Sequence, residues 1–143
     1  MRKNLIAIIL ATIAFSLWGY VWYATVFDDV WQNLISTSES DLLNVAINRG
    51  PIQYLFVILI SLLQVLAIFG GLKWTRAKSF PEYMCLSCGL STLVVLPSIG
   101  NTTLFIGTPL GLLLLDYGHF FFGYAGIAFV LFFLAPSNSK NLK

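Results

Sequence analysis

The chain has 143 residues, of which 58% are hydrophobic and only 10% are charged, with a formal net charge of +2. A soluble globular domain carries about 25% charged residues, so these charges are too few to cover a soluble surface of this size. The length also leaves no room for a soluble catalytic domain beside the apolar stretches. The composition therefore predicts one integral membrane domain over residues 1–143.

Four apolar stretches are long enough to cross a membrane as helices. They run over residues 5–26, 52–72, 83–105 and 110–134. Each is near or above the ~20 residues that an α-helix needs to cross about 30 Å of hydrocarbon. We therefore predict an all-α integral membrane protein, built as a four-helix transmembrane bundle. Its predicted partner is the lipid bilayer, and no basic surface for a nucleic acid is present.

The first stretch ends in a cluster of aromatic residues, Trp18, Tyr20, Trp22 and Tyr23. Such rings prefer the bilayer interface, with the apolar body inward and the polar tip toward water. The cluster therefore predicts an aromatic belt at the outer end of the first helix. Bulky rings also make a poor signal-peptide cleavage site, so we predict that the first span is retained.

The connection after the first stretch has a helical pattern of its own. Apolar residues recur at helical spacing between polar ones, which predicts a short amphipathic helix on the membrane surface or capping the bundle. These residues are Phe27, Val30, Trp31, Leu34 and Ile35. Ser36–Glu39 fits a capping box for a second short helix over 41–46. In the third stretch, Pro97 predicts a kink or a helix end.

The positive charges gather in three of the hydrophilic segments. They are Arg2 and Lys3 at the N-terminus, Lys73, Arg76 and Lys78 in the second connection, and Lys140 and Lys143 in the tail. The first connection is mainly acidic. With four crossings the three basic segments lie on one side, and the positive-inside rule places that side in the cytoplasm. We predict a multi-pass cell-membrane protein with both termini cytoplasmic.

The fourth stretch carries Asp116 and the single histidine of the chain, His119. Asp116, His119, Gly123 and Gly126 are spaced by three, four and three, which places them within roughly 80° of one another on a helix. A charge at mid-membrane costs about 2.5–3.5 kcal/mol on insertion scales. We therefore expect this stripe to face the bundle, where the two glycines would let another helix approach closely.

Buried polar side chains of this kind need partners. Gln64 in the second stretch, Asn101 and Thr102 are the candidates to pair with Asp116 and His119. The pairing is either purely structural or serves a proton-linked or ligand-binding role. One histidine cannot form a metal site alone, and we predict no metal and no cofactor.

Cys85 and Cys88 form a C-x-x-C pair on the predicted third helix. Two thiols on one face can serve a membrane thiol oxidoreductase, or they are two small apolar residues. The pair is predicted near the reducing cytoplasmic side, where a disulfide would not persist. We therefore expect both thiols to stay reduced and to be dispensable.

Three segments together resemble the domain of unknown function 1761 family. The first is Trp18–Phe27 followed by Val30 and Trp31, the second is Ser38–Leu42, and the third is Leu115–Phe120. The resemblance covers most of the chain in order and spacing. It implies a small four-span membrane protein, mostly bacterial and so of the bacterial inner membrane, without an assigned activity. It also implies that Trp22, Tyr23, Trp31, Asp116 and His119 are motif positions.

Three functions remain open at this point. The first is a non-enzymatic helix bundle that acts as an accessory subunit or binds a lipid or a partner, including other membrane subunits or a second copy. The second is a small proton-linked transporter that uses Asp116 and His119, and it predicts a water-accessible cavity at these residues. The third is a thiol oxidoreductase that uses Cys85 and Cys88.

Overall fold

The computed structural model describes residues 2–36 and 51–135, and all structural statements concern these two ranges. Within them the elements are helices: α1 (Arg2–Val21), η1 (Trp22–Val26), α2 (Asp28–Ser36), α4 (Pro51–Thr75), α5 (Phe80–Leu90), η2 (Ser91–Val95), α6 (Leu96–Ile106) and α7 (Leu110–Leu134). The two η elements are π-helical and continue neighbouring α-helices without a break. The described ranges contain no strand.

Four of the helices are long and apolar enough to cross a membrane. They cover Arg2–Val26, Tyr54–Thr75, Phe80–Phe105 and Leu110–Leu134. The predicted all-α integral membrane fold is therefore confirmed. Their backbone groups bond within each helix, which is the condition for entering hydrocarbon.

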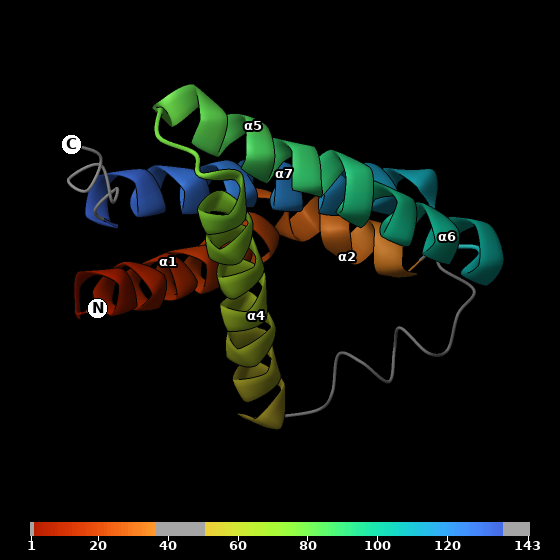
Figure 1. The fold of residues 1–143 in the computed structure, drawn as a ribbon. Coiled ribbons are helices and arrows are strands. Elements are labelled where there is room, and N and C mark those ends of the chain that lie inside the picture. Colours follow the sequence, from red (N-terminus) through yellow and green to blue (C-terminus); the bar gives the residue numbers. More distant parts are fainter. Residues whose placement is uncertain (1, 37–50, 136–143) are drawn as a thin grey trace, which may run out of the picture.

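Helix α7 lies at the centre of the arrangement. It packs against α1, α5, η2 and α6, while α1 and the continuous α5–η2–α6 helix run in the opposite direction to it (Figure 1). The start of α1 and the end of α7 consequently lie at the same end of the molecule (Figure 1). The turn Gly107–Pro109 joins α6 to α7 at the other end, and Gly107 adopts φ +77°, which favours glycine there.

The core between these helices uses small side chains. Ala7 and Ala11 on α1 and Ala128 on α7 are completely buried. Small residues let helix backbones approach closely, and this contact stabilises helix pairs inside a membrane, where the hydrophobic effect is weak. Val65 and Ile68 of α4 and Leu131 of α7 complete the same cluster.

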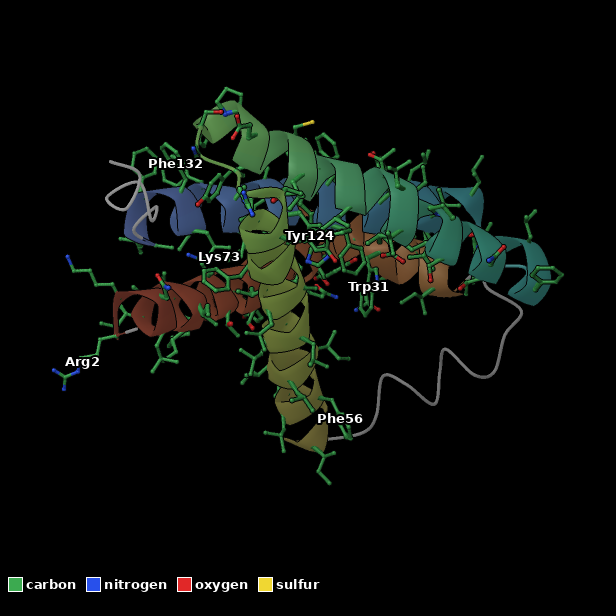
Figure 2. The ribbon with its side chains drawn as sticks, viewed as in Figure 1. Arg2, Trp31, Phe56, Lys73, Tyr124 and Phe132 are labelled. Atoms are coloured by element: carbon green, nitrogen blue, oxygen red, sulfur yellow. The ribbon has the colours of Figure 1, made fainter. Side chains whose placement is uncertain are left out.

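Helix α4 departs from the parallel arrangement. It crosses the other long helices steeply (Figure 1), and its buried residues begin at Ser61. The described side chains between residues 52 and 60 are all exposed, and Figure 2 shows Phe56 on the half that projects from the body. A regular four-helix bundle therefore remains a prediction, whereas three helices do lie side by side.

Two predictions about local structure, the amphipathic helix after the first span and the break at Pro97, can be compared with the observed helices. The amphipathic pattern after the first span forms α2, whose Ile35 is buried and whose Leu34 covers Gly111 at the start of α7. Helix α2 therefore caps the bundle. The second predicted short helix, over 41–46, lies outside the described residues. At Pro97 the third span continues, but π-helical η2 ends at Val95, two residues before the proline, which cannot donate a regular helical hydrogen bond.

Candidate functional site

Asp116 is bound by the π-helical end of the first span. Tyr23 Oη donates a hydrogen bond of 2.7 Å to Asp116 Oδ1. Tyr23 lies within η1, where the helix holds one extra residue per turn, and π-helical turns occur frequently at functional sites. The partner of Asp116 is thus on α1–η1 and is none of the three predicted candidates.

Two further hydrogen bonds from other helices reach the same turn of α7. Thr92 Oγ1 in η2 and Tyr117 Oη are 2.9 Å apart, and Trp18 Nε1 donates to the backbone oxygen of His119 at 3.1 Å. Both π-helical segments therefore place a hydroxyl group against adjacent residues of α7, Asp116 and Tyr117. This concentration of interhelical hydrogen bonds marks residues 116–119 as the polar centre of the fold.

His119 lies beside this centre inside an aromatic enclosure. Its side chain is only 7% exposed, and its ring centroid is 5.0 Å from that of Tyr23, 5.5 Å from Phe15 and 4.9 Å from Phe120. Neither ring nitrogen has a hydrogen-bond partner among the described residues. The expectation that His119 points into the bundle holds, but the expectation that it would find a polar partner there does not.

The aromatic cluster of the first span points inward rather than to the bilayer surface. Trp22 is 8% exposed and packs on Trp18 and Phe27, with ring centroids 5.2 and 4.5 Å away. Of the four predicted belt residues only Tyr20 is exposed. The other three pack around the polar turn of α7, and an aromatic belt at this level of the membrane stays a prediction.

Glycines make this packing possible. A Cβ atom on Gly118 would lie 3.1 Å from Trp22, and one on Gly19 would lie 3.3 Å from His119 Nε2. A Cβ on Gly123 would lie 2.3 Å from the Phe15 ring, so the predicted close approach is present there.

Gly126 is exposed and meets nothing within 4 Å, so its placement on the stripe was wrong. The buried face of α7 follows every fourth residue through Leu115, His119, Gly123, Ile127 and Leu131. Residues four apart on a helix differ by about 40° around its axis, so this row turns gradually around α7. At the level of Gly126 the row lies on another side of the helix.

Asp116 also lines an open pocket of about 180 Å³. Its polar lining is one carboxylate and three hydroxyl groups from α6, the turn and α7. The lining residues are Ser98, Ile99, Thr102, Thr108, Leu112, Leu113 and Asp116. Since a water molecule occupies about 30 Å³ in the liquid, the pocket has room for several waters or one small organic group. Thr102, a predicted partner of Asp116, is thus a neighbour across the pocket.

The other predicted site residues lie elsewhere or play supporting parts. Trp31 in α2 packs on Tyr23, the hydrogen-bond donor to Asp116, with ring centroids 5.9 Å apart, and the Trp22 ring lies 6.4 Å from that of His119. Gln64 lines a separate, mainly apolar pocket of about 270 Å³ with Tyr124, and its Oε1 has no partner among the described residues. Asn101 is exposed.

Cys85 and Cys88 lie on α5 as free thiols, the first exposed and the second partly buried. Within residues 2–36 and 51–135 no three His, Cys, Asp or Glu side chains gather as ligands of a metal ion. Sequence reasoning assigned no site role to Phe15, Thr92, Thr108 or Tyr117, although Tyr117 lies within a segment that resembles the family. Thr92 and Tyr117 follow no recognisable spacing, because they belong to different helices.

Comparison with known proteins gives one match. A family model described as a protein of unknown function (DUF1761) matches residues 6–132, a range that contains every residue of the site. No curated protein and no solved structure gives a significant match.

Proposed function

The chain belongs to the DUF1761 family of proteins of unknown function, and we propose that it is a non-enzymatic binding protein of the membrane whose ligand occupies the pocket beside Asp116. The observation that carries this proposal is that the Asp116 side chain meets two different surroundings. One oxygen accepts a hydrogen bond from Tyr23 inside the bundle, and the same side chain lines an open pocket.

The cost of placing a carboxylate in a membrane explains why this arrangement favours binding. An intramembrane acid is costly, and such residues are retained mainly where they serve a site. Tyr23 supplies one neutral donor, while Ser98, Thr102 and Thr108 add hydroxyl groups around the pocket. A ligand that donates hydrogen bonds to the carboxylate would offset the remaining cost. No second acid or base lines the pocket to support catalysis.

A proton-linked carrier is the second candidate. It is favoured by Tyr23, whose hydroxyl donates to Asp116 while its ring lies 5.0 Å from the His119 ring. A carrier would pass a proton through the imidazole, yet both ring nitrogens are enclosed without a partner among the described residues. We therefore rank a binding protein without transport activity above a proton-linked carrier. A thiol oxidoreductase using Cys85 and Cys88 ranks third, because it needs an oxidising partner at α5.

The proposal includes the setting of the protein. We place it as a single domain in a bacterial inner membrane, with both termini cytoplasmic because Lys and Arg favour those segments. Association with another membrane subunit or a second copy belongs to the same proposal. Reporter fusions at Lys143 and within 36–41 should report opposite sides of the membrane. The same side for both fusions would reject this topology.

The binding role is tested by asking what co-purifies with the protein. Native mass spectrometry should find a small adduct, released intact from the wild-type protein. Thr102→Phe places a ring at the pocket and should remove the adduct, and Asp116→Asn should weaken it. Leu114→Phe is the matched control, because Leu114 is exposed on α7 but does not line the pocket. Equal retention by wild type and Thr102→Phe would refute the proposed site.

A further inference from the structure

We infer that the ligand of the Asp116 pocket is the primary ammonium headgroup of a membrane lipid, an inference that rests on the binding role proposed above. The pocket presents one carboxylate and three hydroxyl oxygens, all of which accept hydrogen bonds. Its lining contains no Lys, Arg or His that would attract an anionic group. The complementary ligand is therefore a small cation with several N–H donors.

The depth of the pocket agrees with the headgroup layer. Asp116 lies six residues after Leu110 at the start of α7, which is about 9 Å along the helix axis. The whole helix of 25 residues is about 37 Å long, somewhat more than the ~30 Å of hydrocarbon. On a centred helix the carboxylate therefore lies about 5 Å inside the hydrocarbon boundary, close enough to the headgroup layer for a lipid ammonium group to enter the pocket.

The surroundings of the pocket select a lipid rather than a free amine. Leu112 and Leu115 on one side of Asp116 are buried, whereas Leu110 and Leu114 on the other side of α7 are exposed. On α6, Leu104 and Phe105 are 80% and 85% exposed. Leu104, Phe105 and Leu110 lie on the two helices that line the pocket and are open to acyl chains in a membrane. A lipid can thus place its headgroup in the pocket while its chains stay in the bilayer.

The chemistry of the nitrogen provides a sharp test. A primary ammonium group donates three hydrogen bonds, whereas the quaternary ammonium group of a choline lipid donates none. Hydrogen bonds to a charged group contribute more than neutral ones, so we expect the ethanolamine lipid to bind at least about tenfold more tightly than the choline lipid with identical chains.

The experiment uses the delipidated full chain in micelles, with phosphatidylethanolamine, phosphatidylcholine or phosphatidylglycerol added singly and retention measured by native mass spectrometry. Preference for phosphatidylethanolamine that is lost in Asp116→Asn and in Thr102→Phe, and kept in Leu114→Phe, supports the inference. Using two pocket variants guards against misfolding of one.

The remaining outcomes separate this inference from the proposed function. Equal pocket-dependent binding of the ethanolamine and choline lipids, or preference for phosphatidylglycerol, overturns the ammonium assignment and leaves a binding pocket. Free ethanolamine that displaces the lipid at similar concentration overturns the lipid source. If no lipid or amine is retained in a pocket-dependent manner, and no co-purifying adduct is found, both the inference and the proposed function fail.

Discussion

Replacing Gly123 with alanine tests whether the enclosure of His119 depends on close packing of α1 and α7. The added Cβ would lie 2.3 Å from Phe15 Cε2 and 3.0 Å from Trp18 Cδ1, so one of these rings must move. Phe15 is 5% exposed and lies against the rings of His119 and Tyr124, at 5.5 and 5.9 Å between centroids. Overpacking of a well-filled site costs about 1–3 kcal/mol, and we expect the free energy of unfolding of Gly123→Ala to lie below that of a Gly→Ala variant at an open position of α7 by that amount.

Gly126→Ala is the matched control on the same helix. Its Cβ would meet nothing within 4 Å, and alanine is a better helix former than glycine by about 1 kcal/mol in water. Thermal unfolding of both variants in one detergent reads out the difference, since 1 kcal/mol shifts Tm by roughly 2–8 °C in small domains. Gly123→Ala should melt below wild type and Gly126→Ala should not. Equal melting temperatures for the two variants would refute the packing argument, and Phe15→Leu should partly restore Gly123→Ala.

Three further changes have defined outcomes. Tyr23→Phe removes the donor to Asp116 and should cost about 0.6–2 kcal/mol of stability, and a double-mutant cycle with Asp116→Ala should show coupling of that size; additive effects would contradict the bond. Glu82→Ala removes the acceptor for the N–H groups of residues 78 and 79 at the start of α5 and should lower the Tm, whereas an unchanged Tm would dismiss the cap. Cys85→Ser with Cys88→Ser should express and melt like wild type, and a mixed disulfide trapped by either single variant would revive the oxidoreductase hypothesis.

The membrane fold was predictable because it depends on the length of apolar runs, which bilayer thickness dictates directly. The short helix α2 followed from an equally local signal, the helical spacing of its apolar residues. The cap at Glu82 could also have been found, since Ser79 and Glu82 have the spacing of a capping box. The steep crossing of α4 could not, because every face of its N-terminal half is similarly apolar and the pattern contains no preferred direction.

The candidate site could be predicted from the sequence only in part. Asp116 and His119 stand out because charged and ionisable residues are rare inside spans. Their partners do not stand out, since Tyr23 looks like an ordinary interfacial aromatic residue. The direction in which Tyr23 points depends on a π-helical turn, and a regular period of 3.6 residues places it on a different face.

The two π-helical segments divide each of their helices into independently oriented parts. Each π turn accommodates an extra residue, and one residue corresponds to a rotation of about 100° around the helix axis. In the first span, the part before Trp22 packs on the core, while η1 presents Tyr23 to Asp116. In the third span, η2 similarly separates α5 from α6, which lines the pocket. A substitution, or the gain or loss of a single residue, at either π turn would therefore re-orient the pocket end of its helix while the alanine-rich contact of α1 with α7 stays the same.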